Sequence, residues 1–220
     1  MELHKDREVY LELIYLTRKH FGYPESQIEK DYWITKLLKD LNSNDFEGNI
    51  FFKGGTSLSK AYHIIDRFSE DLDIFVTKGG IDRPDYTYGQ EKGLNRKIYK
   101  YIESKHKERL KENLCTRGGN YNKAVINYEP AFSNNELKEY LEIEIKSCSL
   151  KNTAAAYYPS DKKYIQSLIG QCLEQKNRND IIRRYGLERF EVNCLNPKKT
   201  ICDKVSRIAR LSYGNNPNPV

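Results

Sequence analysis

The spacing of apolar side chains predicts helices in the first part of the chain. Hydrophobic positions in residues 6–20 recur every three or four residues, the period of a helix with one buried face. A second helix is expected from Ser26 to Leu41, because Ser26 and Glu29 have the spacing of a capping box. Both helices need a partner surface to cover their apolar sides.

Extended segments follow in the middle of the chain. A short apolar run at residues 49–53 ends in two glycines and is followed by helical spacing at 58–65, which predicts strand, turn and helix. Apolar and acidic side chains alternate in residues 71–76 and 140–147, as in strands with one polar face. A further strand is expected at 125–128, where it could pair with 140–147.

Helical spacing returns after Ser160, and a short strand is expected at 190–195. A last helix should begin at Asn196 and Pro197, since asparagine and proline are common at the first two positions of a helix. These elements predict an α+β fold, with a small mixed sheet flanked by helices. We expect three segments: an N-terminal helical segment at 1–48, a catalytic core at 49–150, and a C-terminal helical segment at 151–220 that completes the site.

Composition excludes several classes of protein. The chain has 220 residues, of which 38% are hydrophobic and 31% charged, so it can form a folded core. Its apolar runs are far shorter than the roughly 20 residues of a membrane span, and no secretory signal pattern opens the chain. We therefore expect a cytoplasmic protein. Five scattered cysteines and four histidines lack the spacing of a zinc site, so a metal would be held by oxygen.

Basic residues are concentrated in one stretch. Between Glu91 and Val125 there are ten Lys or Arg and four Glu, an excess of six that equals the formal net charge of +6. Tyr99, Tyr101 and Tyr121 lie among them, a combination that suits binding of a nucleic-acid backbone. A solvated, lysine-rich helix face is the alternative, and the pattern alone does not separate the two.

Two pairs of carboxylates lie on predicted strands. Asp71 and Asp73, like Glu142 and Glu144, are two residues apart, so each pair would project from one face about 7 Å apart along the chain. Carboxylate oxygens from adjacent strands are suitable ligands for two magnesium ions. A solvated strand face is the alternative for either pair taken alone.

The diglycine segment precedes these strands. Gly54, Gly55, Thr56 and Ser57 lie where a strand turns into a helix, a place where backbone N–H groups can bind phosphate and where glycine permits close approach. A simple turn is the alternative. Diglycine, helix and then an acidic strand is a less common order, which combines a phosphate cradle with a metal platform and predicts nucleotidyl transfer.

Two motifs carry a family resemblance. Residues 52–58 (FKGGTSL) and 67–73 (RFSEDLD) resemble the AbiEii/AbiGii-type nucleotidyltransferase toxins of the polymerase-β-like superfamily. Residues 29–34 (EKDYWI) resemble the N-terminal helix of that family, and the similarity extends over about 25–212. The resemblance implies a polymerase-β-like nucleotidyltransferase core with additional helices.

The resemblance also implies roles for individual residues. The nucleotide phosphates would be bound by Gly54, Gly55, Thr56 and Ser57. The metal ligands would be Asp71, Asp73 and Glu144, with Glu142 a poorer match. The catalytic residues would include Ser69, which precedes the metal ligands, and Lys204, which would contact the triphosphate. Family members continue into a helical part with an Arg-x-x-Asp-x-x-Asp-like motif, so a chain ending at Val220 is expected to be a truncated member.

The sequence thus predicts a Mg²⁺-dependent (or Mn²⁺-dependent) nucleotidyltransferase that moves a nucleoside monophosphate from an NTP to an acceptor. By resemblance the acceptor is a tRNA 3′ end, the system is of the toxin–antitoxin or abortive-infection type, and a cognate antitoxin is the protein partner. A catalytically impaired nucleotide- or RNA-binding member of the same fold is the first alternative. Transfer to a protein hydroxyl is the second, because its chemistry is identical.

Overall fold

The computed structural model describes residues 1–44, 46, 49–77, 88–133, 136–147 and 160–213. Its helices are α1 (Arg7–Phe21), α2 (Glu25–Asn42), α3 (Gly54–Lys60), α4 (Tyr88–Lys105), α5 (Leu168–Gln175), α6 (Asn179–Tyr185) and α7 (Pro197–Tyr213). Short 3-10 helices are η1 (Leu3–Lys5), η2 (Lys107–Arg109) and η3 (Glu112–Leu114). The strands are β1 (Ile50–Lys53), β2 (Asp71–Val76), β3 (Tyr121–Asn127), β4 (Tyr140–Ser147), β5 (Ser160–Ile165) and β6 (Phe190–Leu195).

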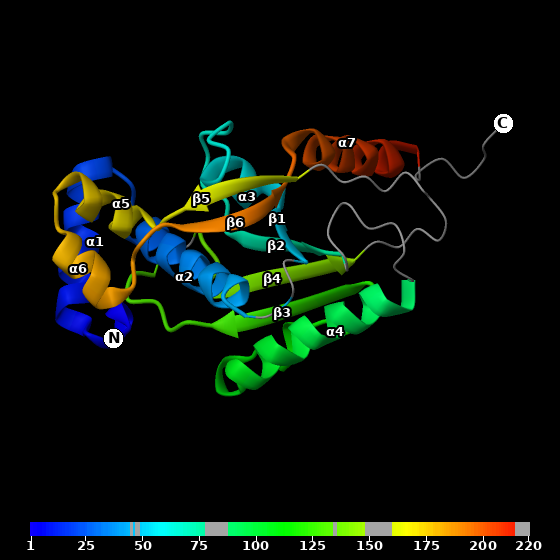
Figure 1. Cartoon of the computed structure of the whole chain (residues 1–220), viewed down its shortest axis with the longest axis horizontal. Coiled ribbons are helices and arrows are strands. Elements are labelled where there is room, and N and C mark those ends of the chain that lie inside the picture. The colour runs from blue at the N-terminus through cyan, green and yellow to red at the C-terminus, as the bar shows by residue number, and fades with distance from the viewer. Residues whose placement is uncertain (45, 47–48, 78–87, 134–135, 148–159, 214–220) are drawn as a thin grey trace.

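These strands form one mixed sheet in the order β3-β4-β2-β1-β6-β5. β2 pairs antiparallel with β1 and parallel with β4, while β6 lies parallel to β1. Helix α4 runs beside β3 and β4, and α1, α5 and α6 gather at one end of the sheet (Figure 1). The predicted α+β class, with a mixed sheet flanked by helices, is confirmed.

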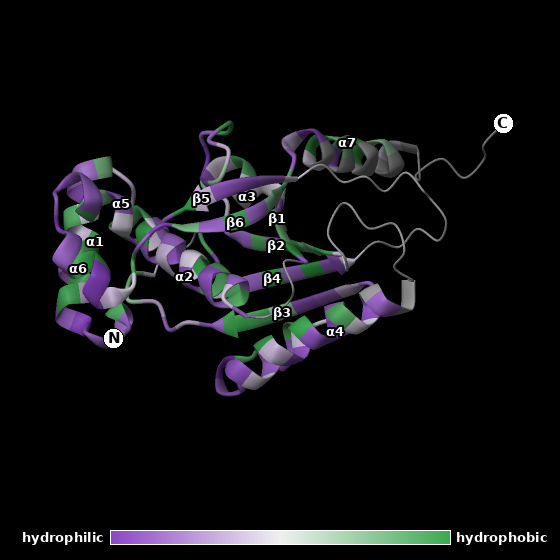
Figure 2. Ribbon diagram, viewed as in Figure 1, coloured by the Kyte–Doolittle hydropathy of each residue, from purple (hydrophilic) through white to green (hydrophobic). Residues whose placement is uncertain are grey.

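One face of the central strands forms the core. The apolar residues of β2 and β4, such as Leu72, Ile74 and Ile143, are buried together with Ile98 and Ile102 of α4. Since successive side chains of a strand point to opposite faces, the acidic residues of both strands lie on the other face. Figure 2 shows the resulting alternation of apolar and polar residues along the strands and α4.

Several predicted elements are confirmed. Strands are found over 71–76, 140–147 and 190–195. β3 pairs antiparallel with β4, as expected of neighbours, although it begins earlier than 125, at Tyr121. At the start of α7, the Asn196 side chain accepts a hydrogen bond from the Lys198 N–H at 3.1 Å.

Other predictions are wrong. Ser26 does not cap α2: the helix begins at Glu25 after Pro24, and Ser26 is buried within it. The helix expected after Ser160 is present as α5 but begins only at Leu168, because residues 160–165 form β5, an edge strand. In both places long-range hydrogen bonds decide the structure: Glu29 bonds to residues 131–132, and β5 pairs with β6.

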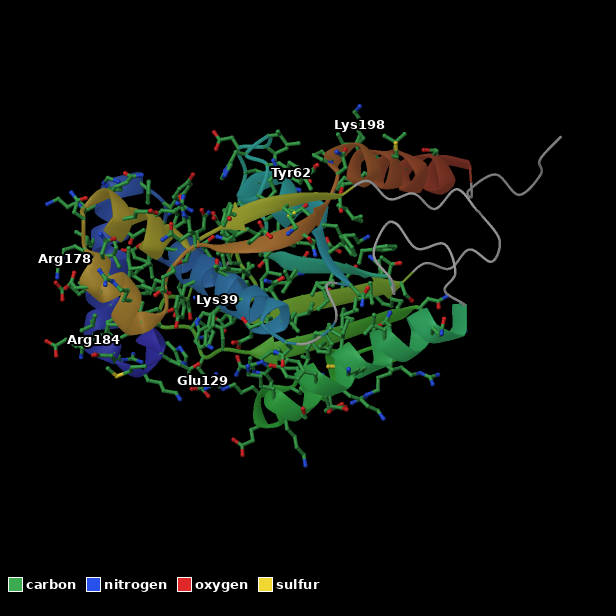
Figure 3. The ribbon with its side chains drawn as sticks, viewed as in Figure 1. Lys39, Tyr62, Glu129, Arg178, Arg184 and Lys198 are labelled. Atoms are coloured by element: carbon green, nitrogen blue, oxygen red, sulfur yellow. The ribbon has the colours of Figure 1, made fainter. Side chains whose placement is uncertain are left out.

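Helix α3 is shorter than the apolar spacing at 58–65 predicts, and it ends at Lys60. Beyond it, the Tyr62 hydroxyl donates its proton to a carboxylate oxygen of Asp161 (2.8 Å) and also lies 3.1 Å from the Leu195 carbonyl. These contacts turn Tyr62 toward β5 and β6 (Figure 3). His63 follows with φ +53°, which is incompatible with a continuing helix.

The proposed segment boundaries at 48 and 150 lie outside the described residues. β5 and β6, from the third segment, belong to the same sheet as β1 and β2 from the second. None of the helices in the described part of the chain combines the length and apolar character needed to cross a lipid bilayer.

Candidate active site

The predicted carboxylates of β2 and β4 lie opposite one another. In the parallel pairing, Asp71 is the partner of Glu142 and Asp73 is the partner of Glu144. Neighbouring strands are about 4.8 Å apart, so this register brings four carboxylates together on one face of the sheet. The alternation in the sequence predicts that the two acids of each strand share a face. The register between β2 and β4 shows in addition that the two pairs are adjacent.

Lys138, which lies just before β4, holds one half of this cluster. Its Nζ atom is 2.9 Å from Asp71 Oδ1 and 3.1 Å from Glu142 Oε2, and its backbone N–H donates to Glu70 Oε2 at 3.0 Å. Partial burial lowers the pKa of Lys138, but the two carboxylates outweigh it and raise the pKa above its ordinary value. The ammonium group therefore stays charged and bridges β2 to β4.

Lys146 occupies the corresponding place in the other half. Its ammonium group pairs with Glu144 and lies 3.9 Å from Asp73 Oδ1, while the Tyr121 hydroxyl donates to Glu144 Oε1 at 3.1 Å. Burial raises the pKa of Asp73 to about 6, with Glu144 and Asp71 adding to the rise. Burial acts in the same direction on Glu144, but its bond to Lys146 outweighs burial and lowers the Glu144 pKa.

The diglycine turn meets this cluster directly. β1 pairs with β2 so that Lys53 is opposite Asp73, and Gly54 follows with φ +80°, a conformation that favours glycine. A Cβ atom on Gly54 would lie 2.0 Å from Asp73 Oδ2, and one on Gly55 would lie 2.8 Å from Ser69 Oγ. Both glycines are required for close contact with the acidic strand and with the segment before it.

The hydroxyl groups of the turn are used within the protein. Thr56 Oγ1 donates its proton to the Asp71 carbonyl and lies 3.1 Å from Ser69 Oγ, and Ser57 Oγ donates to the Gly54 carbonyl at 2.9 Å. Thr56 and Ser57 are both buried. These hydroxyls therefore fix the shape of the turn and its distance from β2, a role that the sequence pattern does not indicate.

The donor chemistry of the cluster fits a hard divalent cation. Carboxylate oxygens are what Mg²⁺ prefers, and the burial that raises the Asp73 pKa would be offset by a positive charge. Among the described residues, no three acidic, histidine or cysteine side chains converge as a ready metal site. Asp71 instead lies against Lys138, and Glu144 against Lys146.

The sequence does not predict the lysine contacts, because Lys138 and Lys146 are two of many lysines in the chain. One signal was available, because Lys146 is two residues from Glu144 on a strand and so shares its face. Arg67 is a further neighbour of the turn, since its Nη2 would lie 3.5 Å from a Cβ atom on Gly55.

A buried lysine on α2 contacts the residues next to the carboxylates of β2 and β4. Lys30 is completely buried, and its ammonium group donates to the carbonyls of Lys138 and Tyr140 and pairs with Glu70 at 3.4 Å. Burial lowers the pKa of Lys30, and Glu70 opposes that shift. Lys30 therefore holds the residues that flank Asp71 on β2 and the start of β4.

Its neighbours on α2 hold two other segments. Glu29 accepts hydrogen bonds from the backbone N–H groups of Ala131 and Phe132 at 3.0–3.1 Å. Asp31 pairs with Lys60 at the end of α3 and accepts from the Leu168 N–H at 2.7 Å. Residues 29–31 (EKD) are thus three consecutive buried charges, and each is bonded to a different segment of the chain.

The remaining predicted residues are Lys204 and the basic stretch, and only part of the basic stretch contacts the carboxylates. Lys204 is exposed on α7, and within the described structure no contact joins it to the diglycine turn. The basic stretch divides: Arg96 and Lys100 are exposed on α4, whereas Lys123 lies 3.6 Å from Glu142. Tyr99 is buried, so its ring is not an open platform for stacking bases.

A mixed sheet that carries paired carboxylates beside a glycine turn is the arrangement expected of a nucleotidyltransferase core. The sequence profile of the family described as nucleotidyl transferase AbiEii toxin, type IV toxin–antitoxin system, matches residues 36–217. The chain therefore belongs to the AbiEii nucleotidyltransferase toxin family, and the predicted family is confirmed.

A solved structure is similar to most of the chain. It is MenT4, a nucleotidyltransferase toxin from Mycobacterium tuberculosis H37Rv, with 16% sequence identity and a TM-score of 0.49 over 90% of this chain. The similar region spans 59% of the MenT4 chain. No curated protein matches the sequence.

Proposed function

We propose that the chain catalyses nucleotidyl transfer, in which an acceptor hydroxyl attacks the α-phosphate of an NTP and pyrophosphate leaves. The observation that carries the proposal is the contact of Gly54 with Asp73, in a sheet register that sets Glu144 beside Asp73. That register places a turn able to approach phosphate next to carboxylates able to hold a cation. Membership of the AbiEii family supports the same reaction.

In this proposal Asp71, Asp73 and Glu144 hold Mg²⁺ or Mn²⁺. The cation, when bound, supplies charge neutralisation at the phosphates and lowers the pKa of the attacking hydroxyl. Gly54 and Gly55 begin α3, and the backbone N–H groups at this start of the helix would bind phosphate oxygens. Lys138 and Lys146, which pair with the same acids, lie where they can bind phosphate oxygens.

Ser69 and Lys204 have secondary roles in the proposal. Ser69, whose hydroxyl is hydrogen-bonded to Thr56, sets the distance between the turn and Asp71. A phosphate on Ser69 would add about two negative charges beside the carboxylates and would disfavour binding of the NTP triphosphate by like-charge repulsion. Lys204 reaches the triphosphate from α7.

The acceptor in this proposal is RNA, with a tRNA 3′ end as the first candidate. The exposed basic side chains of α4 suit an RNA backbone. A cognate antitoxin is the expected protein partner, in keeping with the toxin–antitoxin family. The reaction would take place in the cytoplasm, where NTPs and tRNA are available.

The test is labelling of total cellular RNA with α-labelled NTPs by the parent chain and by Asp71→Ala. We expect the variant to lose at least 100-fold in rate, because a metal ligand acts on the reacting phosphate. Asp180→Ala, on exposed α6, is the control for loss of an aspartate. Equal labelling by the parent and Asp71→Ala would contradict the mechanism, and label on protein alone would replace RNA as the acceptor.

A further inference from the structure

A separate cavity opens at the β3 edge of the sheet. It has a volume of about 360 Å³ and lies between α4 and the segment that leads into β3. The residues that matter for its chemistry are Arg96, Tyr99 and Lys100 of α4, Arg117 before β3, and Asn122 within β3. The carboxylates of the candidate active site are absent from its lining.

The cavity has an excess of positive charge. Arg96 and Lys100 are one helical turn apart, so they share a face of α4, and both are exposed. Within the part of the chain that the structure describes, neither has an ion-pair partner. Arg117 is different, because its guanidinium group pairs with Glu103 at 2.6 Å and with Glu112 at 2.7 Å. Two cations thus remain for a ligand.

Tyr99 gives the cavity a buried polar group. The residue is only 4% exposed, and its hydroxyl has no hydrogen-bond partner among the described residues. The Cys115 thiol lies beside the hydroxyl, but a thiol is a weak partner, and this one donates to the Lys111 carbonyl. A buried hydroxyl without a partner is unfavourable, so an acceptor oxygen entering the cavity would stabilise it.

The cavity and the carboxylate cluster lie on opposite faces of one edge strand. Asn122 lines the cavity, whereas its neighbours Tyr121 and Lys123 contact Glu144 and Glu142 on the other face. β3 is the outermost strand at this edge. A flexible chain that crosses the edge could therefore reach both places with adjacent units.

We propose that this cavity binds a backbone phosphate of the acceptor RNA, a few nucleotides from the end that reacts. The inference rests on the proposed function, because it assumes an RNA acceptor at the carboxylates. Arg96 and Lys100 supply charge, and the Tyr99 hydroxyl donates to a phosphate oxygen. The fixed spacing between this site and Asp71 then positions the 3′ hydroxyl.

The test measures binding of fluorescein-labelled tRNA by anisotropy, without NTP, between 50 and 200 mM KCl. We expect Arg96→Gln/Lys100→Gln to weaken binding at least 10-fold and to reduce the salt slope by about 0.7–0.9, the amount that one lost phosphate contact removes. Lys176→Gln/Arg183→Gln removes the same two charges, one directly after α5 and one on α6, and should change binding less than twofold.

Tyr99→Phe separates binding from folding. It removes only the hydroxyl, so we expect tRNA affinity to fall about threefold to 10-fold while the melting temperature stays equal or rises. A lower melting temperature with unchanged affinity would show a purely structural hydroxyl and would overturn its role. Equal tRNA binding by the parent and Arg96→Gln/Lys100→Gln would overturn the subsite.

These outcomes are independent of catalysis. A chain that labels no acceptor, but whose tRNA affinity falls in the two α4 variants, would retain the subsite and lose the proposed function. A chain that labels RNA with unchanged affinity in those variants would retain the function and lose the subsite. Displacement of tRNA by polyglutamate at equal charge concentration would indicate an acidic protein as the ligand and contradict the proposal.

Discussion

At the residue scale, the contact between Gly54 and Asp73 determines the geometry of the site. Gly54 needs both its left-handed backbone and the absence of a side chain, because its neighbour Asp73 fills the space where Cβ would be. A glycine pair in a sequence indicates a turn or a close approach, but not which residue comes close. That information is in the pairing of β1 with β2.

Gly54→Ala should destabilise the fold more than Gly22→Ala does. Both glycines have φ near +80°, but nothing lies within 4 Å of a Cβ at Gly22, so Gly22→Ala should cost only about 1–2 kcal/mol of backbone strain. Gly54→Ala adds a clash with Asp73, and we expect a loss above about 3 kcal/mol. Urea unfolding measures both, and equal losses would show that Asp73 moves aside freely.

The lysines of the candidate site could not be predicted from the sequence alone. The carboxylates at 71, 73, 142 and 144 stand out in the sequence because they alternate with apolar residues. Lys138 has no such signature, and its pairing with Asp71 depends on the parallel register of β2 and β4. Its place in the site is therefore a property of the fold.

At the scale of elements, α2 does more than cover the sheet. Its buried face carries the Glu29–Lys30–Asp31 sequence, whose partners lie on the loop at 131–132, at the start of β4 and at the end of α3. A capping box was the local interpretation of Ser26 and Glu29. It was wrong because Glu29 forms long-range bonds instead.

Replacing Lys30 should destabilise the protein strongly. Lys30→Met keeps the length of the side chain but leaves two carbonyls and Glu70 without their partner, and we expect a loss of about 3–5 kcal/mol in the free energy of unfolding. Lys39→Met on the same helix (Figure 3) removes an exposed pair with Glu188 and a hydrogen bond to the Gly186 carbonyl and should cost only about 1 kcal/mol. Similar losses in chemical denaturation would refute the anchoring role.

The strands β2 and β4, each with one fully buried face, are predicted correctly, whereas the partly exposed edge strand β5 is not. β2 and β4 lie between other strands, and their strict alternation gave both sets of bounds. β5 is an edge strand whose residues are mostly polar and only partly buried, so its sequence resembles a loop or a helix start. Its hydrogen bonds to β6 form it, and a single sequence does not show them.

At the scale of the whole molecule, the sheet joins early and late parts of the chain. β6 lies beside β1 and covers the edge that would otherwise be exposed next to the diglycine turn. The order of strands therefore makes the C-terminal segment part of the same hydrophobic core. Residues 49–150 contain the acidic strands. They do not contain the whole sheet, because β5 and β6 come from later in the chain.

A fragment of residues 1–150 should therefore fail to fold. It would expose the β1 edge and lose α5, which packs against α1 and α2. The full chain should unfold in one cooperative transition by circular dichroism, whereas the fragment should show no transition or should aggregate. A fragment with a cooperative melt would show that the core folds alone.

The most direct test of the account is a crystal structure of the chain with Mg²⁺ and a non-hydrolysable NTP. We predict a cation bound by Asp71 and Asp73, with phosphate oxygens against Gly54 and Gly55 and with Lys138 or Lys146 turned toward them. A nucleotide bound elsewhere, with both aspartates still paired to lysine, would contradict the central claim that this face of the sheet performs nucleotidyl transfer.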